Sequence, residues 1–155
     1  MNPVAVLKEM MLEGSYEMKA PPERIWHFII DPNKISKCLP DLKSLEIESE
    51  DKFLAVTRVG VGSIKADLKF RIEITGKDPP SRVKLKADGS GSGNRVNLDI
   101  SMELRQVAGG AQLAYKADMK VGGMMAGLGQ RVMMDTAGKT VAGIFDCIKK
   151  QVEQA

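Results

Sequence analysis

A strict alternation of apolar and polar residues runs through the middle of the chain and constrains its fold more than any other feature. From Ile64 to Thr75 every second residue is apolar, and the residues between them are charged or polar. A period of two places the apolar side chains on one face of a β-strand. The same pattern returns in residues 82–88, 96–104 and 112–121. The sequence therefore predicts long strands with one buried face and one solvated face.

Short turn sequences separate these strands and indicate antiparallel pairing. Glycine, proline, asparagine and aspartate gather at residues 76–80, 91–94 and 108–110, and such residues favour tight turns. Links this short join neighbouring strands as hairpins. Three weaker strand patterns come earlier, at about residues 12–20, 42–48 and 52–60. Together they predict a seven-stranded antiparallel sheet with one polar face.

Helical patterns occur in two parts of the chain. Residues 21–30 and 31–38 both begin with proline and an acidic residue, which suit a helix start, so two short helices are expected after the first strand. An apolar stripe at helical spacing predicts a long helix over about Met124–Glu153. Its glycines lower helix propensity and predict a kink or a loosened first half. Since only this helix is long enough to cover the apolar face, the fold class is α+β, with a curved sheet wrapped around the C-terminal helix.

Length and charge limit the classes of protein to which the chain can belong. At 155 residues it fits one domain, expected over residues 11–155, with residues 1–10 as an N-terminal extension without fixed structure. A net charge of +3 with mixed signs argues against a nucleic-acid partner. No segment resembles a secretion signal or reaches the roughly 20 apolar residues of a membrane span. We therefore predict a cytoplasmic protein without an integral membrane span.

The two cysteines, Cys38 and Cys147, are far apart in the sequence and have no metal-binding spacing. Disulfides are rare in reducing compartments, and paired cysteines at short spacing are the usual sign of a metal site. We interpret both cysteines as free buried thiols rather than as a disulfide.

The expected inner face of the sheet carries no group suited to catalysis. Its residues are aliphatic, small or methionine, and the polar exceptions are Tyr16, Thr57 and Tyr115. Acid–base catalysis needs a titratable group at the reacting atom, and a metal site needs several ligands. The only histidine, His27, falls on the polar side of the first helix and is interpreted as a surface residue. The sequence predicts no catalytic residue, no metal site and no cofactor.

Two features of this inner face predict a cavity. Small residues occupy positions where bulky side chains would be needed to fill a core, and methionines gather where the long helix begins. The predicted cavity residues are Tyr16, Ala66, Leu68, Phe70, Leu85, Ala87, Leu98, Ile100, Tyr115, Met119, Met125, Leu128, Val132 and Met133. The alternative, a dry core in which methionines fill gaps, stays open on this pattern alone.

Several short motifs occur in a set order along nearly the whole chain. They are Ala20-Pro21-Pro22-Glu23-Arg24-Ile25-Trp26, Asp31-Pro32, Cys38-Leu39-Pro40, Gly60-Val61-Gly62-Ser63-Ile64-Lys65-Ala66, Ala87-Asp88-Gly89-Ser90-Gly91-Ser92-Gly93 and Gly127-Leu128-Gly129-Gln130-Arg131. In this order, over about Leu12 to Gln151, they resemble the CoxG family of carbon monoxide dehydrogenase subunits, within the START-like helix-grip (SRPBCC) superfamily. Two departures are Asp41, where the family usually has glycine, and an end at Ala155 without the apolar tail that anchors some members.

The resemblance implies a helix-grip fold with a deep apolar cavity between the sheet and the long helix. It implies a non-enzymatic accessory protein that binds a lipid or a quinone and assists a molybdenum hydroxylase of the carbon monoxide dehydrogenase type. A peripheral contact with the inner face of the membrane is compatible with that role. Two alternatives remain: an enzyme of the cyclase or hydratase sort that uses tyrosines in the same cavity, and a structural adaptor with a filled core.

Overall fold

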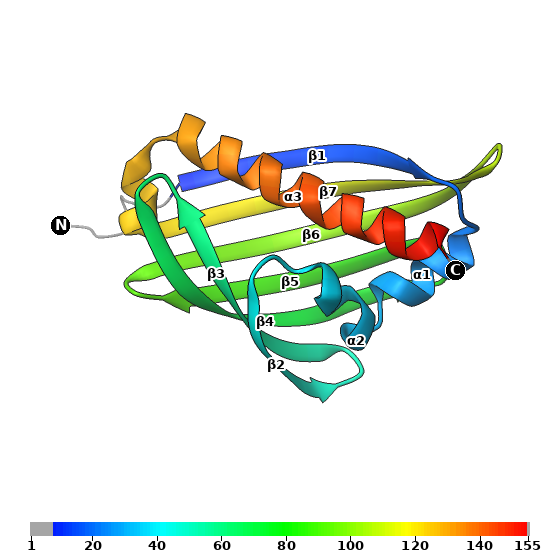
Figure 1. Ribbon diagram of the computed structural model, residues 1–155, viewed down its shortest axis with the longest axis horizontal. Helices are drawn as coiled ribbons and strands as arrows, with labels where there is room; N and C mark the ends of the chain where they lie inside the picture. The colour runs from blue at the N-terminus through cyan, green and yellow to red at the C-terminus, as the bar shows by residue number, and fades with distance from the viewer. Residues whose placement is uncertain (1–7, 155) are drawn as a thin grey trace.

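Seven strands and three helices make up the part of the chain that the computed structural model describes, residues 8–154 (Figure 1). The strands are β1 (Lys8–Met18), β2 (Leu42–Ser49), β3 (Lys52–Val61), β4 (Ile64–Asp78), β5 (Arg82–Gly91), β6 (Asn94–Val107) and β7 (Gly110–Gly123). The helices are α1 (Pro22–Ile29), α2 (Pro32–Ile35) and α3 (Gln130–Glu153), with 3₁₀ turns η2 (Ser36–Cys38) and η3 (Met124–Leu128). The strand order is β1-β7-β6-β5-β4-β3-β2, and all pairs are antiparallel. The predicted fold class is confirmed.

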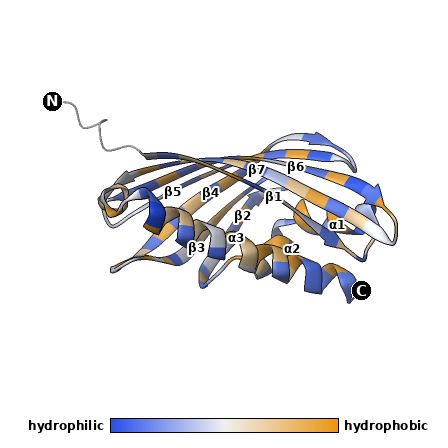
Figure 2. Ribbon diagram, turned by 90° about the horizontal axis from the view of Figure 1, so that it is seen from above, coloured by the Kyte–Doolittle hydropathy of each residue, from blue (hydrophilic) through white to orange (hydrophobic). Residues whose placement is uncertain are grey.

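The alternating pattern divides the sheet into an apolar face and a charged face. All helices lie on one side of the sheet, and apolar and polar residues alternate along its strands (Figure 2). On the outer face, opposite charges stand directly across from each other, as in the pairs Arg58–Asp67 at 3.6 Å and Arg82–Glu103 at 3.4 Å. These side chains are about half exposed, so each pair contributes at most about 1 kcal/mol. The outer charges are a solvated surface, as predicted.

The start of the sheet lies earlier in the chain than expected. β1 begins at Lys8 and pairs with β7 along its whole length, from Lys8 opposite Val121 to Met18 opposite Ala111. It therefore includes the last three residues of the segment expected as an extension. Residues 1–7 of that segment lie outside the described residues.

The two short helices start where the proline and acidic residues predict. Asp31 caps α2, because its Oδ1 accepts a hydrogen bond from the Asn33 backbone N–H at 2.9 Å. Helix α1 buries Ile25 and Trp26 against the sheet side of the core, while His27 is exposed. The segment then ends at Asp41, whose backbone φ is +47°. Glycine adopts this left-handed region most readily, and aspartate tolerates it better than most residues.

The long C-terminal helix is shorter than predicted because it breaks at a glycine. Gly129 has a φ of +88°, and α3 begins only after it, at Gln130. Before the break, η3 is held by Asn94, which is 3% exposed. The Asn94 Oδ1 accepts a hydrogen bond from the Met125 backbone N–H at 2.8 Å, and its amide donates to the Ser92 carbonyl at 3.2 Å. The expected loosening of the first half is thus a separate turn fastened to the β5–β6 hairpin.

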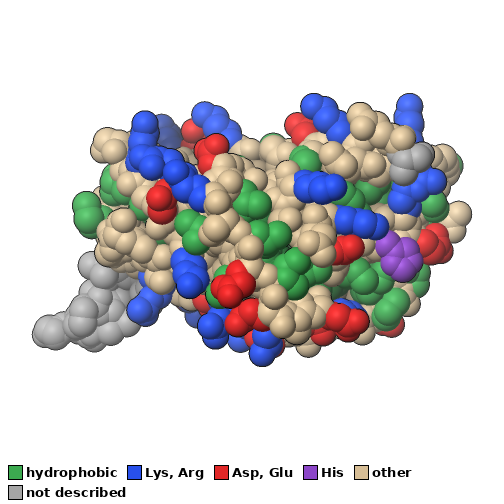
Figure 3. Space-filling view, turned by 60° about the horizontal axis from the view of Figure 1, so that its bottom comes forward, with side chains coloured by type: hydrophobic (Ala, Val, Ile, Leu, Met, Phe, Trp, Pro, Cys, Tyr) green, Lys and Arg blue, Asp and Glu red, His purple; other side chains and the backbone are tan. Residues whose placement is uncertain are grey.

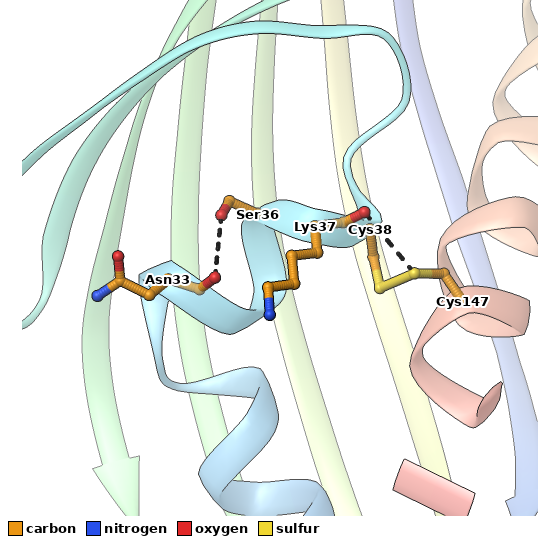
Figure 4. Close-up of a disulfide and its surroundings, with 5 residues drawn as sticks. All are labelled: Asn33, Ser36, Lys37, Cys38 and Cys147. Atoms are coloured by element: carbon orange, nitrogen blue, oxygen red, sulfur yellow. Dashed lines mark hydrogen bonds between the residues drawn. A yellow bond between two sulfur atoms is a disulfide. The ribbon is translucent and has the colours of Figure 1, made fainter. Parts of the chain in front are cut away.

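A disulfide joins Cys38, at the end of η2, to Cys147 in the second half of α3 (Figure 4). Their Cα atoms lie 5.4 Å apart although 109 positions separate them in the sequence. Cys38 is buried, as expected, but the prediction of two free thiols is wrong. The pairing depends on how α3 packs against η2, and the spacing of the cysteines carries no information about that packing.

Candidate ligand cavity

An internal cavity of about 330 Å³ lies between the inner face of the sheet and α3. Strands β1 and β3 to β7 form its floor, α3 forms its roof, and α1, α2 and the loop after η2 close one side. Sites for small molecules typically enclose about 300–1,000 Å³, so this cavity falls at the lower end of the range. The interior is therefore not a filled core.

The lining of the cavity is almost entirely apolar. Its side chains are aliphatic, aromatic, methionine or proline, apart from the hydroxyl groups of Thr57, Tyr115, Thr136 and Thr140. Within residues 8–154, no charged side chain contributes to it. Burial raises the pKa of Tyr115 above 10.0, and the neighbouring Tyr16 adds to this shift. At neutral pH the Tyr115 phenol is therefore protonated and can donate a hydrogen bond.

Most of the predicted cavity residues meet at this cavity. The structure brings together Leu68, Phe70, Leu85, Ala87, Leu98, Ile100, Tyr115, Met119, Met125 and Met133. They come from four strands, from η3 and from α3, and the strand residues share the apolar face that the period-two pattern assigns to them.

The remaining four predicted residues lie elsewhere. The Tyr16 ring is stacked against Phe145, and Ala66 is packed into the core beside the cavity. Leu128 and Val132 cover the β3–β4 turn at Gly62, where Val132 is 37% exposed. Leu128 and Val132 flank the break at Gly129, so the continuous helical stripe expected through these two positions is interrupted there.

The cavity exists because the buried core is divided into two clusters. One gathers around α1 and the C-terminal half of α3, and the other around η3 and the N-terminal half of α3. Four buried apolar residues belong to neither cluster and line the cavity instead: Phe53, Ala55, Ala87 and Ala117. Three of the four are alanines, so the side chains at these places are too short to close the gap.

Not every small residue of the inner face creates space. A Cβ at Gly89 would lie 2.5 Å from the ring of Phe70, so this aromatic ring already fills the position above the glycine. At Gly91 an added Cβ would meet the carbonyl oxygen of Asp67. These glycines allow close packing of β5 on β4, whereas Ala87 and Ala117 leave the open volume.

Three aromatic rings fasten α3 to the edge of the sheet at one end of the cavity. Phe145 of α3 packs against both Tyr16 of β1 and Tyr115 of β7, with ring centroids 4.6 Å and 5.0 Å away, and the two tyrosine centroids lie 6.5 Å apart, so the three rings form a triangle. The planes differ by 10° and 23°, so the rings are stacked. Such pairs stabilise by about 0.5–1.5 kcal/mol beyond their burial.

Part of the cavity wall comes from elements that the sequence did not assign to it. Residues Ile29, Ile30, Ile35, Leu39 and Pro40 line the cavity from the short helices and the loop, whereas only the sheet and the long helix were expected to form walls. Thr136 and Thr140 line it from α3. The two threonines lie three and seven positions after Met133, which is the helical spacing of one face, so this signal was present in the sequence.

The cavity opens where its two exposed lining residues, Pro40 and Thr140, and their partly exposed neighbours reach solvent. On one side these are Ile35, Leu39 and Pro40, here named the loop lip. On the other side they are Thr136, Thr140 and Ile144 of α3, here named the helix lip. The space-filling view with the bottom of the molecule turned forward shows hydrophobic side chains at the surface between charged ones (Figure 3). The mouth of the cavity therefore lies between the loop lip and the helix lip.

A second hollow, of about 650 Å³, lies on the outer face of β1, β6 and β7. It is larger but open to solvent, and its walls carry side chains of both charges, including Glu13, Glu103 and Lys116. It does not enclose a ligand as the inner cavity does. Among residues 8–154, no three His, Cys, Asp or Glu side chains are grouped to hold a metal ion, and no helix is long and apolar enough to cross a membrane.

Comparisons with known proteins agree with this architecture. The model of the CoxG family, described as a subunit of carbon monoxide dehydrogenase, matches residues 14–153. A conserved protein from Geobacillus kaustophilus is 30% identical, with a TM-score of 0.86 over 94% of this chain and 96% of that one. A START superfamily protein from Mycobacterium smegmatis shares the fold at 14% identity, with a TM-score of 0.71 over 93% of this chain and 97% of that one. None of the curated proteins matches the chain.

Proposed function

This chain belongs to the CoxG family of carbon monoxide dehydrogenase subunits, and from that premise we propose that it is a non-enzymatic accessory protein that binds a hydrophobic ligand. The observation that carries the proposal is the cavity under α3, which is large enough for a small molecule and has no charged group in its described walls. Water inside such a space would find few hydrogen-bond partners, so an apolar ligand is its best-matched occupant.

We propose that the ligand is a lipid or a quinone. The apolar walls suit a hydrocarbon portion, and the hydroxyl groups of Tyr115, Thr136 and Thr140 suit one or two oxygen atoms. A carboxylate or phosphate would stay outside the cavity, because a charge without a partner is costly to bury. The volume of about 330 Å³ is small, so a long ligand would extend through the mouth.

We also propose that the protein assists a molybdenum hydroxylase of the carbon monoxide dehydrogenase type. This partner rests on the family description alone. A pull-down with the tagged protein from its own source should recover such an enzyme, and the recovered complex can be checked for molybdenum.

The geometry favours a ligand-binding protein over an enzyme. Of the two tyrosines that an enzyme of the cyclase or hydratase sort would need, Tyr16 is held in the aromatic stack. The raised pKa of Tyr115 makes its phenol a poor general base at neutral pH. Neither tyrosine has a carboxylate, histidine or lysine beside it in the described lining of the cavity.

The test is ligand binding by a matched pair of variants on β7. Ala117→Leu adds three carbons to a buried wall of the cavity, whereas Ala114→Leu makes the same change on the outer face of the same strand. The uncharged fluorescent probe N-phenyl-1-naphthylamine brightens in apolar surroundings and reports occupancy. We expect wild type and Ala114→Leu to bind it alike and Ala117→Leu to bind it at least about tenfold more weakly, a difference of about 1.4 kcal/mol.

Two results would contradict the proposal. One is a wild-type protein that binds neither the probe nor any member of a panel of lipids and quinones. The other is equal binding by the two variants, which would place the ligand outside the cavity. Native mass spectrometry of protein from its own source gives an independent measurement, because a resident ligand adds its mass to that of the chain.

A further inference from the structure

The disulfide joins the segment that carries the loop lip to the helix that carries the helix lip, although neither cysteine lines the cavity itself. Cys38 directly precedes Leu39 of the loop lip, and Cys147 follows Ile144 of the helix lip by three positions, about one helical turn. The next lining residue on α3, Ile148, is adjacent to Cys147. No other covalent link fixes the distance between the loop lip and α3 in residues 8–154.

Apart from apolar packing, polar contacts that support this connection are sparse within the described part of the chain. The C-terminal end of α3 is held elsewhere, by the Arg24 Nη1 donating to the Val152 carbonyl at 3.2 Å and by the Lys19 N–H donating to Glu153 at 2.8 Å. Between residues 31–41 and α3, the polar contact found is that of the Cys147 sulfur with the Lys37 carbonyl, at 3.8 Å. A disulfide sulfur carries no proton, so this contact is a hydrogen bond only after reduction (Figure 4).

The two sulfurs differ in how well a reductant can reach them. Cys38 is 6% exposed, whereas Cys147 is partly exposed on the surface of α3. Thiol–disulfide exchange requires a thiolate to approach one sulfur atom along the bond. The structure therefore offers the Cys147 sulfur to an external thiolate and shields that of Cys38.

We propose that the Cys38–Cys147 disulfide is a redox latch that controls ligand exchange through the mouth of the cavity. In the oxidised form, the loop lip is tied to α3 and a bound ligand is retained. A dithiol reductant supplies two electrons and two protons: the S–S bond breaks, Cys38 and Cys147 become thiols, and the dithiol becomes its own disulfide. In the reduced form the lips are joined by apolar contacts and the Cys147–Lys37 hydrogen bond, so ligand enters and leaves faster.

The latch rests on the proposed function, because it regulates the same cavity. It predicts a change in rate rather than the loss of the site, since none of the four hydroxyl groups of the lining and no wall residue is altered by reduction. The aromatic stack and the C-terminal contacts of α3 also remain. The fold should therefore survive reduction.

The experiment measures the dissociation rate of N-phenyl-1-naphthylamine by stopped-flow fluorescence. Three forms are compared: the oxidised wild type, the wild type reduced with dithiothreitol, and the Cys38→Ser, Cys147→Ser double variant. Reduction should raise the rate about tenfold, equivalent to about 1.4 kcal/mol. The double variant should release the probe at the reduced rate, and dithiothreitol should leave that rate unchanged. Circular dichroism of the reduced wild type checks that the domain is still folded without relying on the variant.

Several outcomes would overturn the latch. Equal dissociation rates in all three forms, with the probe bound, would refute the latch while leaving the ligand-binding function intact. Failure of the probe to bind any form would refute the ligand-binding function together with the latch. Two free thiols persisting after treatment with oxidised glutathione, or unfolding of the wild type on reduction, would also refute it.

Discussion

Removal of the ring that α3 contributes to the aromatic stack tests how the helix is held over the sheet. Phe145→Ala deletes a side chain that is 6% exposed and packs against both Tyr16 and Tyr115. Truncation of a buried phenylalanine to alanine typically costs about 3–5 kcal/mol of stability. One side of Phe145 already borders the cavity and has fewer packing partners there, so we expect the lower end, about 3 kcal/mol.

The matched control is Phe145→Leu, which keeps most of the volume and removes only the stacked contacts. With a stacked pair contributing about 0.5–1.5 kcal/mol, this variant should lose about 1–2 kcal/mol. Urea unfolding of the oxidised protein measures both losses, and an unchanged slope shows that the same surface is exposed on unfolding. The melting temperature of Phe145→Ala should fall by about 6–12 °C.

The reasoning fails if Phe145→Ala loses less than about 1 kcal/mol, or if the two variants lose the same amount. Either result would mean that the contacts of Phe145 with the two tyrosines do not fasten the helix. Probe binding gives a second check on the same variant. Because the deleted ring borders the cavity, Phe145→Ala should still bind the probe although it is less stable.

Two further predictions concern a buried amide and a partly buried phenol. Asn94→Ala leaves the Met125 N–H without its acceptor and should destabilise the protein by about 1–3 kcal/mol. Hydrogen exchange in residues 124–128, measured by mass spectrometry, should become faster, and unchanged exchange there would contradict the prediction. The pKa of Tyr115 is raised above 10.0 in the folded state, so the unfolded chain loses the proton first and stability falls as pH rises through that value. Tyr115→Phe should lose less stability than wild type in urea unfolding between about pH 9 and 11, and equal losses would argue against the burial of the phenol.

The strands were predictable because their signal is local. From Ile64 onward the period of two assigns side chains to faces, and the register found in β4 to β7 agrees with it except at the β-bulge between Ile74 and Gly76. Strand ends were less predictable, because hairpin pairing extends a strand beyond its alternating part. β5, for example, continues through glycines to Gly91, where backbone hydrogen bonds continue without apolar side chains.

The features that were missed depend on how separate elements meet. The wall formed by Ile30, Leu39 and Pro40 requires the short helices to fold back over the sheet, and no spacing in the sequence encodes that contact. The disulfide was not predictable for the same reason. Free thiols were expected instead, because disulfides are rare in a reducing compartment such as the cytoplasm. The break at Gly129 was predicted only in part. Glycine weakens a helix, so a disturbance was expected, but the position of the break follows from the turn that Asn94 holds.

The pairing of β1 with β7 has a consequence for how the chain is made. β1 leaves the ribosome first, but its partner strand is synthesised about ninety residues later, which takes roughly 5–20 s at usual rates of elongation. The helix that covers the apolar face comes last of all. During that interval the nascent sheet exposes an unpaired edge and an uncovered apolar surface, so the growing chain is most prone to aggregation before α3 has emerged.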